Sequence, residues 1–301
     1  MNRRRLLMLG AAGAVLAGCA DGSSRTPVRL AAGEAGGFYH AFAGLVVAAA
    51  ERAGKVRIER LTTSGSRENL RLLADGRADV ALTLSDSVGE ATSGAFALGR
   101  VYENYLQLVV RADSTVRAVG DLRGTRVSLG ADGSGAASTG ARMLWAAGLD
   151  PANDVVASHH PLEVAVRALA AGEIDALLWA GGVPTRLFDI PARMRLVSIG
   201  ELTGPMRERF GPAYDHVQIP ADVYPGGAAV QTIGVANLLL AAASLGQAQA
   251  AAIVELLLYE ADSLVPNEAA GTQFLDGRSL ITTGSVPLHP GAAAVYREWH
   301  G

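Results

Sequence analysis

Residues 71–82 read RLLADGRADVAL, and residues 167–178 repeat the same pattern as RALAAGEIDALL. Each copy predicts a helix that ends at a glycine, because glycine readily takes the positive φ of a helix C-terminus. In each copy an aspartate, Asp79 or Asp175, then leads into an apolar run that is typical of a buried strand. We expect both aspartates to stabilise turns rather than to bind a ligand.

A second pattern, consisting of a strand, a glycine-rich loop and a helix, precedes each of these copies. The first occurrence comprises the strand Val28–Ala31, the loop glycines Gly33, Gly36 and Gly37, and a helix over Phe38–Ala53 that Gly54 closes. The second comprises the strand Arg126–Leu129, the glycines Gly130, Gly133 and Gly135, and a helix that ends near Gly148. Two repeated patterns in the same order predict two α/β lobes of similar build.

Two strand-like segments, Tyr105–Arg111 and Gln231–Asn237, separate these units. We interpret them as crossovers between the lobes, so that the C-terminal part of the chain completes the first lobe. The predicted organisation is lobe 1 over residues 27–110 and 231–301, and lobe 2 over residues 111–230.

The N-terminus predicts export and lipidation. Three arginines at 3–5 precede an apolar run over Leu6–Ala17, and small residues then lead to Cys19, the only cysteine of the chain. We predict a lipoprotein signal peptide over 1–18, lipidation at Cys19, a linker over 19–26, and a periplasmic or extracytoplasmic protein anchored to the membrane. An ordinary signal peptide and an anchor helix are alternatives, and the arginines leave the export route open between the general and the twin-arginine pathways.

The most apolar later stretch, Leu238–Ala252, is interpreted as a buried helix. It is expected to belong to a helical region that runs to about Leu264 rather than to a membrane span, which needs a longer uninterrupted apolar run.

Composition and motifs exclude several functions. Only 18% of the 301 residues are charged, and the net charge is −3 without basic blocks after the N-terminus, so neither disorder nor a nucleic-acid partner is expected. Gly133-Ser134-Gly135 begins like a dinucleotide fingerprint, but Ser138 replaces its third glycine. The histidines show no metal-binding spacing, and His289 is interpreted as part of a structural turn. No catalytic residues, cofactor or metal are therefore expected.

Candidate ligand contacts come from loops after predicted strands, where helices begin. Glycines let the backbone approach a ligand, while free N–H groups and serine hydroxyls at a helix start bind anions. Each candidate also has a structural alternative. Ser66 is equally consistent with a simple helix cap, Ser134 and Gly135 with a tight turn, and Tyr39 with a core aromatic. Asp86 fits a ligand amine, backbone bonds or an ion.

The sequence resembles the TAXI-type solute receptors of TRAP transporters over about residues 28–299. The matching segments, in order, are Gly36–Tyr39, Gly65–Leu73, Val109–Ser114, Asp121–Ser128, Gly133–Gly135, Gly181–Thr185, Ile219–Ala221 with Tyr224, and Pro287–Ala292. The chain differs from the family's usual pattern at His40, at Leu84 with Ser85, and at Ala136, where a tyrosine, a glutamine-asparagine pair and a threonine are frequent.

This resemblance implies an α/β, two-lobed periplasmic-binding-protein type II fold with a hinge and a ligand cleft between the lobes. It implies a receptor that captures a glutamate-like amino acid or a dicarboxylate such as 2-oxoglutarate for an ion-gradient-driven TRAP-type permease. Together with the loop argument, it gives these ligand-site candidates: Gly37, Tyr39, Ser66, Asn69, Asp86, Ser134, Gly135 and Gly182.

Two other functions remain open from the sequence. The same pair of lobes could serve a periplasmic sensor that feeds a signalling partner. An exported enzyme that uses the glycine-rich loop for a phosphate or nucleotide is a weaker alternative, because no catalytic set is assembled.

Overall fold

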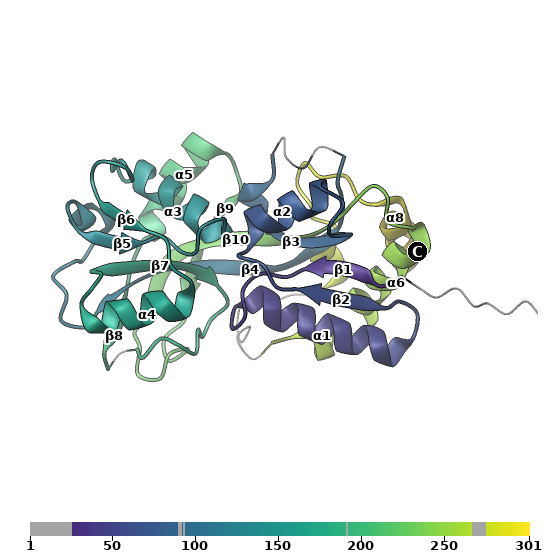
Figure 1. The fold of residues 1–301 in the computed structure, drawn as a ribbon, viewed down its shortest axis with the longest axis horizontal. Helices are drawn as coiled ribbons and strands as arrows, with labels where there is room; N and C mark the ends of the chain where they lie inside the picture. Colours follow the sequence, from purple (N-terminus) through teal and green to yellow (C-terminus); the bar gives the residue numbers. More distant parts are fainter. Residues whose placement is uncertain (1–25, 90–91, 93, 191, 267–274) are drawn as a thin grey trace, which may run out of the picture.

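The computed structural model describes residues 26–89, 92, 94–190, 192–266 and 275–301. They form two lobes that lie side by side along the long axis of the molecule (Figure 1). The predicted signal peptide, Cys19 and all but the last residue of the predicted linker lie outside the described residues. Among the helices that are described, none is long and apolar enough to cross a membrane.

Lobe 1, at the right of Figure 1, contains the first and last parts of the chain. Its elements are β1 (Val28–Ala31), α1 (Phe38–Ala53), β2 (Ile58–Leu61), α2 (Ser66–Ala74), β3 (Val80–Leu84), α6 (Gln247–Tyr259), α7 (Gly277–Leu280) and α8 (Pro290–His300). Strands β2, β1 and β3 are parallel neighbours. Helices α1, α6 and α8 bury apolar side chains in one continuous core on this sheet.

Lobe 2 contains the middle of the chain. Its elements are β5 (Arg126–Ser128), α3 (Gly135–Ala146), β6 (Val156–Ser158), α4 (Leu162–Ala171), β7 (Ala176–Gly181), β8 (Met194–Val197), α5 (Thr203–Phe210) and β9 (Tyr214–Ile219). Strands β7, β5 and β6 are parallel neighbours, as β3, β1 and β2 are in lobe 1. The two lobes therefore repeat one arrangement.

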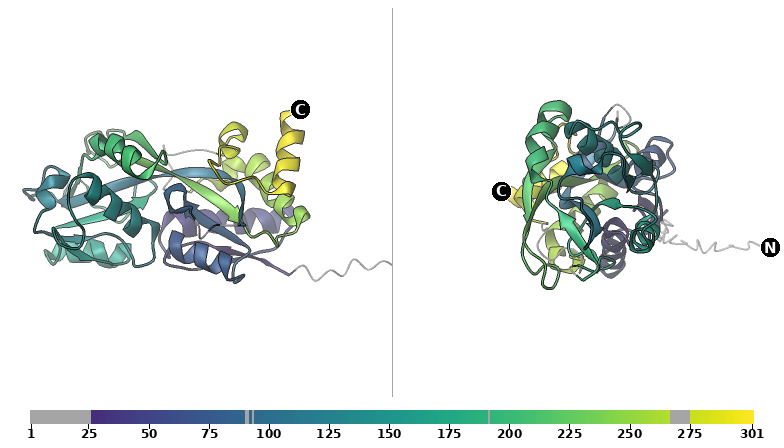
Figure 2. Two further views of the ribbon diagram at one scale, coloured as in Figure 1. Left: turned by 90° about the horizontal axis from the view of Figure 1, so that it is seen from above. Right: turned by 90° about the vertical axis from the view of Figure 1, so that its left-hand side faces the viewer.

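Two long strands, β4 (Phe96–Arg111) and β10 (Val230–Ala241), run through both lobes and pair antiparallel with each other (Figures 1 and 2). In lobe 1, β10 pairs with β3. In lobe 2, β4 pairs with β7 and β8, and β10 pairs with β9. The result is one sheet with the order β2-β1-β3-β10-β4-β7-β5-β6. Because both lobes share these strands, the lobe boundaries at 110/111 and 230/231 stay a prediction.

The repeated aspartates bind repeated arginines. Asp79 accepts hydrogen bonds from the Arg29 backbone N–H (2.8 Å), Nε (3.0 Å) and Nη2 (2.8 Å). Asp175 accepts the same three from Arg126, at 2.9, 3.0 and 2.7 Å. Each aspartate thus ties the start of a β-strand to the turn after a helix. The expected turn role is confirmed, although the sequence analysis did not identify the arginine partners.

The predicted helix over Leu238–Leu264 is wrong in its first part. Residues up to Ala241 continue β10, and α6 begins only at Gln247. Leucine favours helices in isolation, but here the apolar run fills a central strand that pairs with β3 and β4. The strand predicted from Tyr105 likewise starts earlier, at Phe96.

His289 has the structural role predicted for it. It is buried and caps α8, where its Nδ1 accepts from the Gly291 N–H at 3.2 Å. Its Nε2 lies 3.1 Å from the Leu245 carbonyl oxygen, so this nitrogen carries the proton.

Candidate functional site

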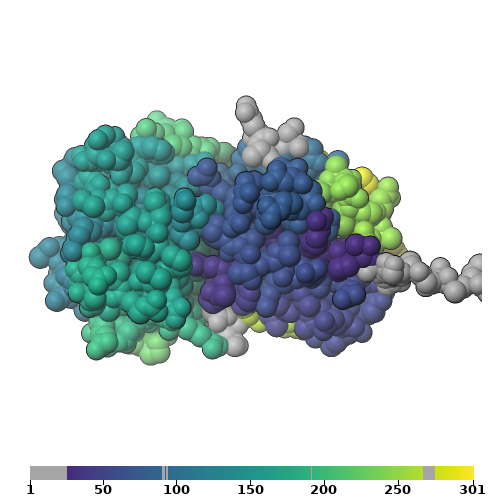
Figure 3. All heavy atoms as spheres, viewed as in Figure 1, coloured from purple at the N-terminus to yellow at the C-terminus, as the bar shows by residue number. Residues whose placement is uncertain are grey.

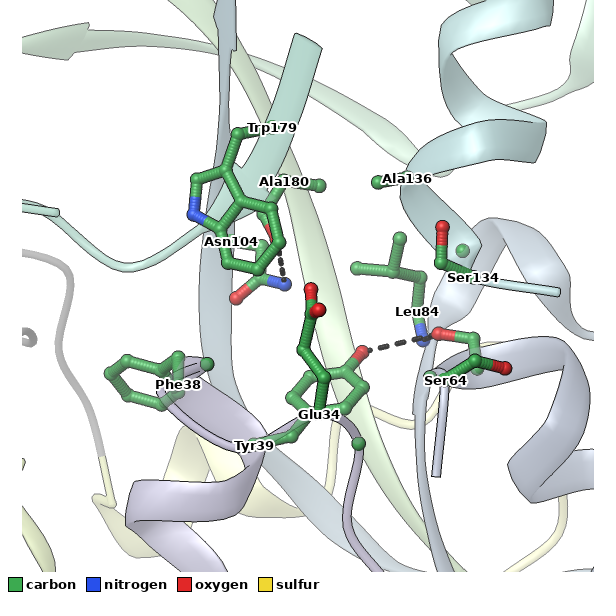
Figure 4. A pocket seen from close by; sticks show the side chains of 15 residues that line it. Glu34, Phe38, Tyr39, Ser64, Leu84, Asn104, Ser134, Ala136, Trp179 and Ala180 are labelled. Carbon is green, nitrogen blue, oxygen red and sulfur yellow. Dashed lines mark hydrogen bonds between the residues drawn. The ribbon is translucent and has the colours of Figure 1, made fainter. Parts of the chain in front are cut away.

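A small cavity lies where the two lobes meet, beside the crossing strands. Its volume is about 40 Å³, which is room for a few water-sized groups. Lobe 1 contributes Gly33, Glu34, Gly37, Phe38, Tyr39, Ser64, Gly65, Ser66 and Leu84; β4 contributes Asn104; and lobe 2 contributes Ser134, Gly135, Ala136, Trp179 and Ala180 (Figure 4). We call this space the inner cavity.

Three helices begin at the inner cavity, and the residues that precede them line it. These N-terminal residues are Gly37 for α1, Gly65 for α2 and Ser134 for α3. The first N–H groups of a helix have no partner within the helix, and the helix dipole makes this end positive. Helices from both lobes therefore present donors to one space, although no lysine, arginine or histidine is among its lining residues.

The repeated glycine-rich loops occupy equivalent positions before α1 and α3. Gly33 and Gly36 in lobe 1 have φ values of 82° and 81°, and their counterparts Gly130 and Gly133 have 98° and 74°. These positive values require glycine, since other residues are strained there. The spacing of glycines in the sequence thus fixed where the two helices start.

The two lobes are in contact, which corresponds to a closed arrangement (Figure 3). The Glu68 N–H of α2 donates to the Gly133 carbonyl of lobe 2 at 3.3 Å. A Cβ at Gly135 would lie 2.5 Å from Ser66 Oγ and 2.7 Å from Leu84 Cδ1, so only glycine permits this approach.

Hydroxyl groups join the cavity to β10, one of the two strands that run through both lobes. The Tyr39 hydroxyl donates to Asn237 Oδ1 and lies 3.3 Å from Ser66 Oγ. Ser66 Oγ also accepts from the Leu84 N–H at 3.0 Å. Burial raises the pKa of Tyr39, so its hydroxyl stays protonated. The proton of Ser66 remains available to a ligand or to Tyr39.

The two candidate serines have different local roles. Ser134 caps α3, because its Oγ accepts from the Ala137 N–H at 3.1 Å, and its own hydroxyl proton remains able to reach the cavity. Ser66 is not a helix cap: it is the first residue of α2, and Gly65 holds the cap position with φ 126°. The sequence alternative of a capping Ser66 is therefore wrong.

Asp86 lies outside the inner cavity, in a buried cluster between the lobes. From its place after β3, its Oδ2 contacts Arg142 Nη1 (3.0 Å), Thr139 Oγ1 (2.7 Å) and the Tyr214 hydroxyl (3.1 Å), all in lobe 2. Its carboxylate is thus bound by side chains of lobe 2, and Asp86 is not among the residues that line the inner cavity.

Two other candidates also lie away from the inner cavity. Asn69 is fully buried behind it, where it bonds to the Thr63 hydroxyl and donates to the Leu82 carbonyl at 2.7 Å. Gly182 lines a separate outer cavity of about 490 Å³, and its carbonyl accepts from Gln107 Nε2 at 3.3 Å. Of the eight candidates, the structure brings Gly37, Tyr39, Ser66, Ser134 and Gly135 together.

Three prominent lining residues were not among those predicted from the sequence. Glu34 lies inside the first glycine-rich loop. Its position there could have identified it, because an acid in this loop faces the same space as the glycines. Trp179 lies in β7, a strand interpreted only as buried. Asn104 lies in the part of β4 that was not predicted; its Nδ2 donates to the Ala180 carbonyl at 3.2 Å, and its buried Oδ1 has no hydrogen-bond partner among the described residues.

The shared sheet, the two lobes and the cavity between them define the α/β periplasmic-binding-protein fold. A phosphonate ABC transporter binding protein from Pseudomonas aeruginosa is similar, with a TM-score of 0.52, 10% identity, and coverage of 78% of this chain and 74% of that one. The aliphatic sulphonate binding protein SsuA from Escherichia coli gives a TM-score of 0.47, 17% identity, and coverage of 91% and 84%. The GluR0 ligand-binding core with L-glutamate gives 0.47, 14%, and coverage of 80% and 97%.

Within this class, the chain belongs to the NMT1-like family, whose family model matches residues 30–299. This match covers nearly the whole described chain.

Proposed function

We infer that this protein is an extracytoplasmic solute-binding receptor that captures a small acidic metabolite and delivers it to a membrane permease. One observation carries the proposal: the N-termini of α1, α2 and α3, from both lobes, converge on one small cavity beside the strands that the lobes share. The acid group of a ligand would accept hydrogen bonds from donors of both lobes at once.

Binding would rest on backbone N–H groups and on the Ser66 and Ser134 hydroxyls. Each favourable helix end contributes about 0.3–1 kcal/mol, and up to about 2 kcal/mol when partly buried. Because these donors come from different lobes, the ligand binds the closed form more tightly than the open form. That difference in affinity shifts the protein toward closure, and the permease would recognise the closed shape.

The resemblance to TAXI-type receptors supports a TRAP-type permease as the partner, and the apolar run and small residues before Cys19 support a lipid anchor there. The phosphonate-binding protein from Pseudomonas aeruginosa, by contrast, is a component of an ABC transporter. Neither permease type alters the proposed chemistry of the cavity, which needs no catalytic residue or cofactor.

Thermal unfolding against a ligand panel tests this function. The purified protein is unfolded and refolded to remove carried-over ligand, then mixed with amino acids, dicarboxylates, sulfonates and phosphonates. A ligand at a hundredfold excess over Kd adds about 2.7 kcal/mol to the free energy of unfolding. For a chain of this size, that corresponds to a rise in Tm of roughly 5–10 °C.

A rise in Tm with at least one acidic metabolite, and none with neutral compounds of similar size, is the expected result. The absence of any shift across the panel, in protein shown to be folded by circular dichroism, would contradict the receptor function.

A further inference from the structure

The inner cavity contains one carboxylate and no basic side chain. Glu34 is the only aspartate or glutamate among its lining residues. In Figure 4, its carboxylate points into the space bounded by Trp179 and Asn104 on one side and by Leu84 and Ser134 on the other. The side chains therefore supply only negative charge, while the positive pole comes from helix N-termini.

Glu34 lies near the start of α4 in the opposite lobe. Burial raises the pKa of Glu34, and the nearby Leu162 backbone N–H opposes the rise. A buried carboxylate without a cationic neighbour is costly, and a positive group close to it would stabilise its charged form.

Asn104 provides a second acceptor. Its Nδ2 donates a hydrogen bond to the Ala180 carbonyl. This bond orients the amide and leaves Oδ1 as the atom that can accept from a ligand. That Oδ1 is buried without a partner among the described residues, although Asn104 lines the cavity. Buried acceptors normally have donors, so a ligand that donates hydrogen bonds would complete this site.

Aromatic rings complete the surroundings of Glu34. Phe38 and Trp179 are both buried, and both line the inner cavity together with Glu34. Aromatic faces attract cations electrostatically, by about 0.5–1 kcal/mol when exposed and about 2 kcal/mol or more when desolvated. An acid and two aromatic rings favour a cationic group and disfavour a second acid group at this end.

The same three residues, Glu34, Phe38 and Trp179, also line the outer cavity. The two spaces therefore adjoin at Glu34. The inner cavity of about 40 Å³ takes only a small head group, whereas the outer cavity of about 490 Å³ has room for a substituent.

We propose that the ligand is a zwitterion, in which an ammonium group is joined to a carboxylate, sulfonate or phosphonate, and that Glu34 binds the ammonium. The acid group lies at the N-termini of α2 and α3, the ammonium lies between Glu34, Asn104 Oδ1 and the Trp179 ring, and any side chain extends into the outer cavity. This assignment rests on the proposed receptor function. It disfavours dicarboxylates that lack an amine, including 2-oxoglutarate.

Matched ligand pairs measured by isothermal titration calorimetry test the assignment. Each pair differs only in the ammonium group: L-glutamate and glutarate, L-alanine and propionate, L-leucine and 4-methylpentanoate, taurine and ethanesulfonate. We expect at least one ammonium compound to bind tenfold or more tightly than its partner. In Glu34→Gln, that preference should fall by tenfold or more, while affinity for the partner lacking the amine stays equal or rises.

Glu59→Gln is the matched control, because it removes the same charge from an exposed position on β2. Thermal unfolding of both variants establishes that they fold. Tight binding of amine-free acids that is unaffected by Glu34→Gln would overturn the zwitterion assignment and leave the receptor function standing. No binding of either member of any pair, nor of any other acid in the panel, would overturn both.

Discussion

At the scale of single residues, Gly135 decides how closely the lobes approach. It is the first residue of α3, and a Cβ at this position would overlap Ser66 and Leu84 of lobe 1. Its φ is not positive, so alanine fits the helix itself and is obstructed only by the opposite lobe. An alanine at this position therefore obstructs the contact between the lobes without disturbing the helix itself.

Gly135→Ala should lower ligand affinity by tenfold or more, because the added methyl group obstructs the closed contact. The free energy of unfolding should change little, or rise slightly, since alanine favours a helix by up to about 1 kcal/mol over glycine. Calorimetric titration and chemical denaturation measure these two effects. Gly204→Ala in α5, where a Cβ would meet open space, is the control. Parental affinity in Gly135→Ala would show that this contact is not needed for binding.

The sequence predicts the backbone of the site better than its side chains. Glycine spacing located the loops before α1 and α3, because positive φ at Gly36 and Gly133 and the close approach at Gly135 exclude other residues. Polar type alone could not separate Ser66, which lines the cavity, from Asn69, which lies behind it, since only the turn of the helix decides which one faces inward. Trp179 was missed because an apolar strand looks the same whether its end faces a core or a cleft.

At the scale of elements, the paired strands β4 and β10 connect the two lobes, and the proposed closure would depend on them. Glu103 of β4 lies opposite Ala236 of β10, with only 12% of its side chain exposed. Its Oε1 is 3.6 Å from Arg100 Nη2. Burial raises the pKa of Glu103 to about 7, while Arg100 opposes the rise and Asp215 adds to it. We therefore expect the stability of the protein to depend on pH through Glu103.

Glu103→Gln should stabilise the protein at high pH only. Above the ordinary glutamate pKa of 4.5 the unfolded chain releases its proton, whereas folded Glu103 keeps it until about pH 7. The free energy of unfolding of the unsubstituted protein therefore falls as pH rises from about 4.5 to about 7, by at most about 3 kcal/mol. Glutamine has no such loss, so denaturation midpoints should differ at about pH 8 and coincide near pH 4.5. A difference independent of pH would contradict this account.

The elements themselves were largely predictable, and the exceptions have one cause. The local signals around α1 were strong, and its bounds at Phe38 and Ala53 are as predicted. Leu238–Ala241 was assigned to a helix because a leucine-rich run carries no strand periodicity when both faces are buried. Its position between β3 and β4 is a property of the tertiary fold.

At the scale of the whole molecule, Asp86 joins the two lobes from outside the lining of the inner cavity. Its carboxylate is almost fully buried and contacts Arg142, Thr139 and Tyr214, all of the other lobe. A charged pair formed across the cleft is separated when the cleft opens, and both groups are then hydrated again. The cluster therefore belongs to the closed arrangement.

Asp86→Asn should make the ligand-free protein more extended and weaken ligand binding. Removing Asp86 from the pair leaves the Arg142 charge, whose side chain is only 28% exposed, without its partner in the closed form, and opening relieves this cost. Small-angle scattering measures the radius of gyration with and without ligand. Asp154→Asn is the control, since it breaks an ion pair with Arg123 inside lobe 2. An unchanged radius together with parental affinity would contradict the role given to Asp86.

The shared strands also set the order in which the molecule can be built during synthesis. Lobe 1 begins the chain, but β3 lacks its neighbour β10 until all of lobe 2 has been made. Until then β3 has an unpaired edge, which is the kind of edge that promotes aggregation. Lobe 2, whose elements β5 to β9 are continuous in the chain, has the more local contacts and is favoured to form earlier. The lobe that emerges first from the ribosome is thus the last to be completed.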